Sequence, residues 1–208
     1  MFVRATTLQA DPTRLDEGIA FVRERVLPAA AELPGSLGMS MFVDRASNLV
    51  SVTSAWESEQ TRVDADQVLT PLRARGARIM GRTQPPATEL FELAVLDHRR
   101  PAEQGFWVRM TRVSIDPSQV DAAIDAYSAS TVHDLGLLEG YCSAVLLVNR
   151  VDGLEAVSVT FESKRALEAS RTQAESIRTA GLDKAGAQVT EVRESEIVIA
   201  GIRMPQSG

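Results

Sequence analysis

The sequence contains one stretch twice, at positions that differ by 105 residues. Residues 50–58 read Val-Ser-Val-Thr-Ser-Ala-Trp-Glu-Ser, and residues 155–163 read Glu-Ala-Val-Ser-Val-Thr-Phe-Glu-Ser. Each copy has the pattern of a strand that ends in an aromatic residue and runs into a Glu-Ser helix start. The same offset aligns most of the chain without a gap and gives roughly eighteen identities in about ninety positions, well above chance. We interpret the chain as two homologous repeats.

Periodicity divides the chain between these repeats. A chain of 208 residues has room for two domains of about 100 residues each. Residues 98–105 lack helical or strand periodicity and contain Pro101 and Gly105, which indicates a linker. We therefore expect repeat 1 at residues 1–97, the linker at 98–105, and repeat 2 at 106–208, ending in a short polar tail.

Each repeat has the pattern β-α-β-β-α-β, which is the ferredoxin-like arrangement. Asp-Pro steps predict the start of the first helix in each repeat, Ser58 and Ser163 should cap the second helices, and Pro71 should kink its helix. The apolar free face of each four-stranded sheet favours an α+β fold with two sheets packed face to face. The expected strands are 2–9, 37–43, 49–56 and 89–96 in repeat 1, and 107–115, 142–149, 154–161 and 188–199 in repeat 2.

Composition narrows the classes of partner. The net charge of −6 argues against a general binder of nucleic acid or of an anionic membrane, because both require excess basic charge. Cys142 is the only cysteine, so the chain can form neither an intrachain disulfide nor a cysteine-based metal site. No apolar run approaches the ~18 residues that cross a bilayer. A cytoplasmic protein without nucleic-acid or membrane partners is expected.

Three features carry a resemblance to a known family. They are Trp56-Glu57-Ser58, its counterpart Phe161-Glu162-Ser163, and the glycines Gly35 and Gly140 before the second strand of each repeat. The sequence resembles the dimeric α+β barrel superfamily, and within it the antibiotic biosynthesis monooxygenase-like domains. The resemblance implies two ferredoxin-like repeats packed as an intramolecular barrel, that is, a single-chain pseudo-dimer. It is compatible with further homo-oligomers.

The same family contains cofactor-free oxygenases, haem-degrading enzymes and members without known activity. Its haem-degrading members combine an Asn on the first strand, this Trp, and a His on the second helix. Only Trp56 matches here, since neither the first strands nor the helices after Ser58 and Ser163 supply the other two residues. Haem turnover is therefore not expected, and neither a cofactor nor a metal is predicted.

Two matched pairs of residues are candidates for ligand binding. Trp56 and Phe161 could stack on a planar ligand or could fill the core at a strand end. Arg4 and Arg109 lie in the middle of strands, where an arginine is costly unless it is paired. They could hold an anionic or enolate oxygen of a ligand, or they could pair with carboxylates of the closing strands, namely Glu89, Glu92, Glu194 or Glu196.

Two residues of repeat 2 complete the candidate site. His133, at a helix end, could be a catalytic base for a phenolic substrate or a solvated residue. Tyr127 lies on the apolar stripe of its helix and could bind ligand or be a core tyrosine. The leading hypothesis is a small-molecule-binding protein similar to cofactor-independent monooxygenases that act on aromatic or polyketide-like compounds. The alternative is a non-catalytic ligand-binding or structural barrel, and a cavity of a few hundred Å³ would favour the enzyme.

Overall fold

The computed structural model of the chain describes residues 1–203, apart from the side chains of Lys184 and Ala185. The described part forms two compact units. Unit 1 comprises Met1–Phe91 and the described residues from Ile197 onward, and unit 2 comprises Glu92–Glu196. The end of the predicted polar tail, residues 204–208, lies outside the described residues. The last described residues thus belong to the same unit as the first.

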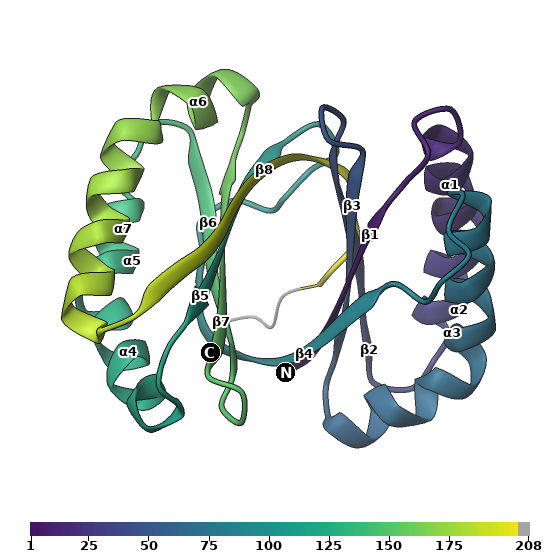
Figure 1. Ribbon diagram of the computed structural model, residues 1–208, viewed down its shortest axis with the longest axis horizontal. Helices are drawn as coiled ribbons and strands as arrows, with labels where there is room; N and C mark the ends of the chain where they lie inside the picture. Colours follow the sequence, from purple (N-terminus) through teal and green to yellow (C-terminus); the bar gives the residue numbers. More distant parts are fainter. Residues whose placement is uncertain (204–208) are drawn as a thin grey trace. The chain divides into compact units, whose positions relative to one another are not determined.

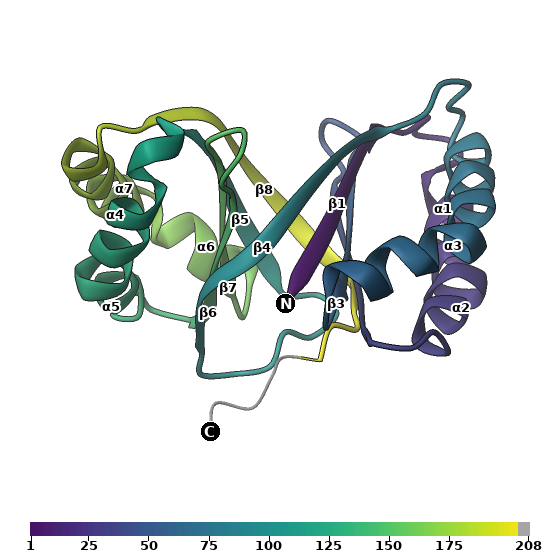
Figure 2. The same ribbon diagram turned by 90° about the horizontal axis from the view of Figure 1, so that it is seen from below.

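Unit 1 places its helices on one face of its strands, as Figures 1 and 2 show. The chain then enters β4 (Ala87–His98), which passes from unit 1 into unit 2 after Phe91. The preceding elements are β1 (Phe2–Gln9), α1 (Leu15–Phe21), η1 (Val22–Val26), α2 (Leu27–Ala31), β2 (Ser36–Asp44), β3 (Leu49–Trp56) and α3 (Glu59–Ile79).

Unit 2 repeats this plan, with its helices again on one face of its strands (Figure 1). The segment that we expect to be a linker, 98–105, begins with the last residue of β4, His98, and its other residues lie between β4 and β5. The elements that follow are β5 (Trp107–Ser114), η2 (Pro117–Gln119), α4 (Val120–Ala126), η3 (Tyr127–Thr131), α5 (Val132–Leu135), β6 (Tyr141–Asn149), β7 (Leu154–Phe161), α6 (Lys164–Ala169), α7 (Arg171–Ala185) and β8 (Gln188–Ala200).

The order of the strands confirms the predicted fold class. Neighbouring strands follow the sequence β4-β1-β3-β2 and then β8-β5-β7-β6, and within residues 1–203 this order closes into one barrel. Each group of four has the order of a ferredoxin-like repeat. The second part of β4, Glu92–His98, pairs with β6 in unit 2. The chain is therefore an α+β protein with the dimeric α+β barrel fold, built from two ferredoxin-like repeats.

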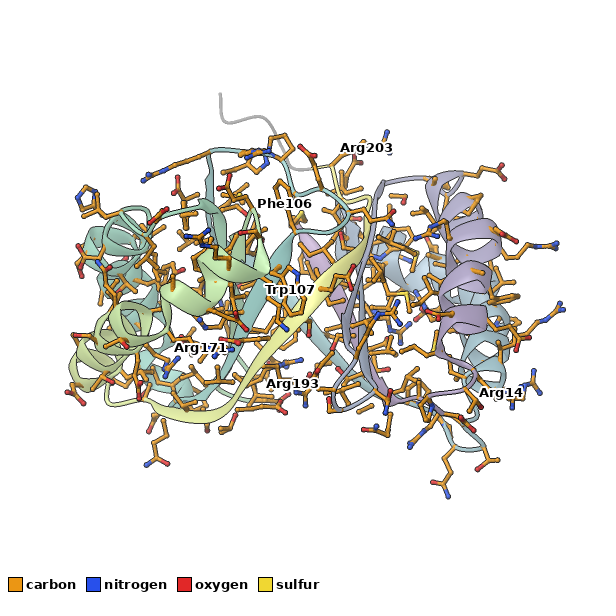
Figure 3. The ribbon with its side chains drawn as sticks, turned by 90° about the horizontal axis from the view of Figure 1, so that it is seen from above. Arg14, Phe106, Trp107, Arg171, Arg193 and Arg203 are labelled. Atoms are coloured by element: carbon orange, nitrogen blue, oxygen red, sulfur yellow. The ribbon has the colours of Figure 1, made fainter. Side chains whose placement is uncertain are left out.

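Each unit has its own hydrophobic core between helices and strands. Trp56 and Phe161 are fully buried and belong to the cores of units 1 and 2, respectively. In both units the aromatic residue ends the central strand, directly opposite the first residue of its neighbour: Trp56 faces Phe2, and Phe161 faces Trp107. Trp107 follows Phe106 at the start of β5 (Figure 3). Burying such a side chain contributes about 1.5–3 kcal/mol, which makes both residues structural anchors.

The first helices begin later than the Asp-Pro steps predict. The carboxylate of Asp11 accepts hydrogen bonds from the backbone and side chain of Thr13, and α1 begins only at Leu15, after Arg14 (Figure 3). Asp116 accepts the same two bonds from Ser118 and caps the short 3₁₀ turn η2. Both aspartates use their carboxylates to close a local turn, which competes with helix formation.

The second helices are capped as predicted but differ in length. Ser58 accepts from the backbone N–H of Thr61 and caps α3, which continues through Pro71, and Ser163 accepts from the backbone N–H of Ala166. The helix that begins after Ser163 divides at Ser170 into α6 and α7, although the sequence predicts one helix. Its Leu167 carbonyl accepts from Arg109 and from the Ser170 hydroxyl, which supplies the physical reason for the division.

Candidate functional site

A π-helical turn interrupts the helical segment after β1 and after β5. These turns, η1 (Val22–Val26) and η3 (Tyr127–Thr131), occupy equivalent positions of the two repeats. Such turns are rare in proteins and occur often at functional sites. Each begins with a buried residue, Val22 in unit 1 and Tyr127 in unit 2. The fold thus presents an apolar side chain in one unit and a phenol in the other.

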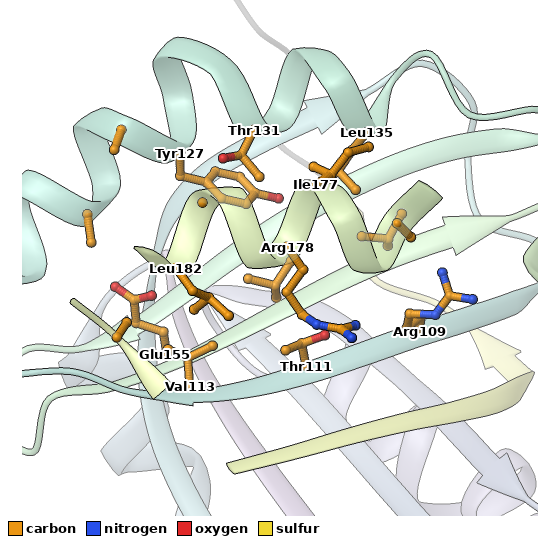
Figure 4. A pocket seen from close by; sticks show the side chains of 17 residues that line it. Arg109, Thr111, Val113, Tyr127, Thr131, Leu135, Glu155, Ile177, Arg178 and Leu182 are labelled. Carbon is orange, nitrogen blue, oxygen red and sulfur yellow. The ribbon is translucent and has the colours of Figure 1, made fainter. Parts of the chain in front are cut away.

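Unit 2 encloses a cavity of about 80 Å³ between its helices and strands (Figure 4). Tyr127 projects into it from the helical side and Glu155 from β7, while Arg178 reaches across from α7 toward Thr111 (Figure 4). The rest of the lining is mostly apolar and includes Val113, Ala123, Leu135, Val157, Val159, Ala174, Ile177 and Leu182. An apolar wall with a few convergent polar groups is typical of a small-molecule site.

Two polar atoms of this lining lack hydrogen-bond partners. The hydroxyl of Tyr127 and Oε1 of Glu155 are both buried, and neither bonds to any described residue. Burial raises the pKa of Tyr127, and the charges of Asp97 and Glu155 raise it further. Burial also raises the pKa of Glu155. Unpaired buried polar groups are few in folded proteins and require an explanation.

Comparison of the repeats identifies both groups as departures from an apolar pattern. At the offset of 105 residues, Glu155 corresponds to Val50 and Tyr127 to Val22. Val50 and Val22 belong to the hydrophobic core of unit 1. Valine therefore satisfies the fold at both positions of unit 1, so packing alone does not require the polar pair of unit 2.

Arg109 lies at one end of the same cavity and is held by a dense set of acceptors. Its Nε and Nη2 donate to Oε1 of Glu194 at 3.0 and 2.8 Å, Nη1 donates to Ser170, and Nη2 also donates to the carbonyl of Leu167. Arg171, on the helical side of unit 2 (Figure 3), donates to Glu194 at 2.6 Å. Burial acts to raise the pKa of Glu194, but the bonds from Arg171 and Arg109 outweigh it and lower that pKa. Glu194 is one of the predicted carboxylate partners.

Unit 1 has a smaller cavity of about 40 Å³ in the equivalent place. Its polar lining consists of Thr6, Ser54 and Arg73. The side chain of Met80 lines this cavity and packs closely against α1, since a Cβ atom on Gly18 would lie 2.3 Å from its Cγ. The two units therefore differ in both the size and the polarity of this space.

Arg4 belongs to an arginine-rich cluster beside the unit 1 cavity. Asp66 on α3 accepts from Arg4 and, at 2.7 Å, from Arg73, and it forms a longer ion pair of 3.9 Å with Arg62. Arg62 also pairs with the exposed Glu59 at 3.7 Å. Burial lowers the pKa of Arg73, and the neighbouring charges of Arg4 and Arg62 act in the same direction. Asp66 is a partner that the sequence interpretation did not include.

The remaining predicted residues do not line either cavity. The indole of Trp56 donates to the hydroxyl of Ser54 at 3.2 Å, within the core of unit 1. Phe161 lies in the core of unit 2, where the guanidinium of Arg109 is 5.6 Å from its ring centre. His133 is exposed on α5 and does not line the unit 2 cavity. The structure thus brings Arg109 and Tyr127 to one cavity and leaves the other four predicted residues outside it.

Sequence reasoning missed Glu155 and Arg178, which line the same cavity. The signal for Glu155 was present in the repeat comparison, because a carboxylate replaces Val50 in an inward-facing strand position. Arg178 corresponds to Arg73 of repeat 1, so the comparison of the repeats shows no difference at this position. Among the described residues, no group of three or more His, Cys, Asp or Glu side chains could hold a metal ion. None of the helices in residues 1–203 combines the length and apolar character needed to cross a bilayer.

Known proteins resemble the chain in sequence and in structure. No family profile matches it. It is 36% identical over 206 residues to the uncharacterized protein Rv2557 of Mycobacterium tuberculosis (strain ATCC 25618 / H37Rv), a match that covers 99% of this chain and 91% of that protein.

Solved structures with little sequence identity show the same fold. A candidate monooxygenase from Fusobacterium nucleatum has a TM-score of 0.71 at 10% identity and covers 97% of this chain and 93% of its own. An anthrone oxidase-like protein has a TM-score of 0.68 at 16% identity and covers 99% and 96%, respectively. The resemblance to monooxygenase-like proteins that the sequence predicts is thus confirmed for the fold.

Proposed function

The chain belongs to the family of the mycobacterial protein Rv2557, and we propose that it binds a small aromatic or polyketide-like molecule and oxidises it as a cofactor-independent monooxygenase. The observation that carries this proposal is the unpaired pair of Tyr127 and Glu155 in the unit 2 cavity. The monooxygenase-like fold supports it, since such proteins share this architecture. We also propose that neither nucleic acid nor an anionic membrane is a partner, because the net charge of −6 disfavours both, and that the location is the cytoplasm.

Glu155 has the environment of a general base. Its pKa is raised by burial, which makes its carboxylate a stronger proton acceptor than an exposed glutamate. Its free Oε1 lies in an apolar cavity, where an acidic C–H or O–H of a ligand would be its hydrogen-bond donor. We assign the role of base to Glu155 rather than to His133, because His133 is exposed and does not line the cavity.

Tyr127 has the environment of a hydrogen-bond donor. Because its pKa is raised, its hydroxyl stays protonated at neutral pH and can donate to an oxygen on the ligand. A donor aimed at the oxygen where negative charge develops stabilises the transition state. Base and donor in one cavity suit the removal of a proton from a carbon beside a carbonyl or phenol. Arg178, on the lining, adds a positive charge that favours the resulting anion.

The oxidation then requires only O₂ as a second reactant. Glu155 takes a proton from a CH₂ group of the substrate, and the carbanion transfers electrons to O₂ and forms a carbon–oxygen bond. Loss of the second hydrogen and cleavage of the O–O bond give a carbonyl group and one water molecule. The substrate is oxidised, O₂ is reduced, and no atom remains unassigned.

The small volume of the unit 2 cavity favours the alternative function, a non-catalytic barrel. At about 80 Å³ it is smaller than the few hundred Å³ expected for a drug-sized ligand, and smaller than the ~150 Å³ cavity that accommodates benzene. A ligand of one or more rings therefore requires movement of lining side chains such as Arg178 or Leu182. A non-catalytic ligand-binding or structural barrel does not need that movement.

Oxygen consumption distinguishes these two functions. The purified chain is mixed with hydroxyquinones, anthrones and simple phenols, and O₂ uptake is recorded with isotopically labelled O₂. The enzyme hypothesis predicts uptake with one compound class, labelled oxygen in its product, and loss of most turnover in Glu155→Gln. The variant Thr6→Val, which changes the unit 1 cavity instead, should retain turnover. Binding of a compound without O₂ uptake would identify the non-catalytic barrel.

A further inference from the structure

A cluster of arginines adjoins the cavity of unit 1, whose lining includes Arg73. Three guanidinium groups, those of Arg4, Arg62 and Arg73, share the carboxylates of Asp66 and Glu59. Glu59 is exposed, whereas Arg62 is buried. The cluster therefore has more positive than negative charge in a partly buried region, an arrangement that a bound anion would stabilise.

Hydrogen-bond donors in this cluster remain unused. Nε of Arg4 and Nη2 of Arg73 are buried and have no hydrogen-bond partner among the described residues. Asp66 is already committed through the other nitrogens of these two arginines. In unit 2 Arg109, which matches Arg4, uses all three of its guanidinium nitrogens, so the free Nε of Arg4 is not a general property of the repeat.

The adjacent cavity adds a hydroxyl donor and an apolar pocket. Ser54 accepts the indole N–H of Trp56 with its oxygen, which leaves its own O–H free to donate. Ser54 and Arg73 both line the cavity, and the other walls are mainly apolar, with Leu8, Val22, Val26, Val52, Leu72 and Met80. A space of about 40 Å³ exceeds the ~10–15 Å³ that one water needs.

We propose that unit 1 binds a short-chain carboxylate, whose carboxyl group is held by Arg73 and Ser54 and whose one- or two-carbon tail lies against Leu72 and Met80. The unpaired Nη2 of Arg73 gives a charge-assisted hydrogen bond to one carboxylate oxygen, and the Ser54 hydroxyl donates to the other. The positive charges of Arg4 and Arg62 stabilise the bound anion. The apolar walls distinguish such a ligand from chloride, which has no tail to bury.

Thermal unfolding at constant ionic strength tests this site. Sodium chloride is replaced stepwise by sodium acetate, propionate or hexanoate, and the Tm of the full chain is recorded. We expect a saturable rise of Tm with acetate and propionate, and no rise with hexanoate, which is too long for the cavity. Arg73→Gln should abolish the rise. Arg178→Gln, the same change at the matching position of unit 2, should preserve it.

A second measurement keeps the proposal testable if Arg73→Gln does not fold. Magnetisation transfer between propionate and protein methyl groups is recorded in the wild-type chain, where contacts to Leu72 and Met80 are expected. An equal Tm in chloride and in carboxylate, retention of the rise in a folded Arg73→Gln, or transfer to Ile177 of unit 2 in place of Leu72 would each overturn the proposal. The outcome of both experiments is independent of the proposed oxygenase activity, because the carboxylate site lies in unit 1 and the proposed oxygenase site lies in unit 2.

Discussion

Glu155 of unit 2 and Val50 of unit 1 occupy equivalent positions on equivalent strands, and both are buried. One side chain packs into an apolar core, whereas the other places a carboxylate with a raised pKa and a free oxygen into a cavity. A protein that folds with valine at this position does not need a carboxylate for stability. Residues that destabilise the fold are often retained at functional sites, and we therefore infer that Glu155 contacts a ligand.

Glu155→Val should therefore stabilise the chain at neutral pH, by about 1–3 kcal/mol, the usual cost of a buried unsatisfied polar group. The folded state raises the pKa of Glu155, so it favours the protonated form. The penalty is absent at pH values below the unfolded pKa of ~4.3 and grows as the pH rises toward the folded pKa. Tm measured against pH should show wild type and variant converging in acid and separating at pH 7. A variant that is less stable at pH 7 would contradict this interpretation.

Val50→Glu is the reciprocal change, and it should destabilise the chain. It buries a carboxylate in the core of unit 1, where Val50 is fully buried. We expect a loss of about 3 kcal/mol or more in the free energy of unfolding, measured by urea denaturation, because an unpaired carboxylate is buried. If Val50→Glu were tolerated as well as wild type, the two positions would not differ in the way that the structure indicates.

The sequence predicted the strands well because their pattern repeats with period two. The expected strands 2–9, 49–56 and 154–161 coincide with β1, β3 and β7. The π-helical turns η1 and η3 could not be predicted, since a single inserted residue leaves the apolar helical stripe recognisable. The division of the last helix depends on a bond from Arg109 to Leu167, a contact between distant segments that no local pattern reveals.

The candidate site was only half predictable. Tyr127 could be selected because it is an aromatic residue on an apolar stripe with a hydroxyl group. Glu155 lies in the repeated stretch itself, but strand periodicity alone does not show whether an inward carboxylate is paired. Only the structure shows that Arg109 is satisfied by Glu194 whereas Glu155 is not.

Arg109→Ala should destabilise the chain strongly. Arg109 is buried and bonds to Glu194, Ser170 and the Leu167 carbonyl, so its loss leaves several acceptors without a donor. Breaking such a buried pair costs about 3–5 kcal/mol. Arg171→Ala is the matched control, since Arg171 contacts the same Glu194 from an exposed position and its loss should change stability much less than the loss of Arg109. Urea denaturation of both variants tests this, and equal losses would contradict it.

Gly38→Ala should destabilise unit 1 more than Gly105→Ala destabilises unit 2. Both glycines have positive φ angles, +106° and +90°, so both substitutions impose backbone strain of about 1–3 kcal/mol. A Cβ atom on Gly38 would also lie 1.9 Å from the carbonyl oxygen of Gly201, whereas a Cβ atom on Gly105 would meet nothing within 4 Å. The difference in Tm between the two variants measures how much the close approach of Gly38 on β2 to Gly201 contributes to the loss of stability. Equal Tm values would show that this approach is not rigid.

Ligand-induced thermal stabilisation of the wild-type chain and of Glu155→Val tests the proposed site most directly. A library of hydroxyaromatic compounds is screened at saturating concentration, where a ligand at about 100 times its Kd adds ~2.7 kcal/mol of stability. We predict a clear rise of Tm with one class of compound in the wild type, a reduced rise in Glu155→Val and Tyr127→Phe, and an undiminished rise in Thr6→Val, which changes only the unit 1 cavity. An equal rise in all four proteins, or no rise with any compound, would contradict a ligand site built from Glu155 and Tyr127.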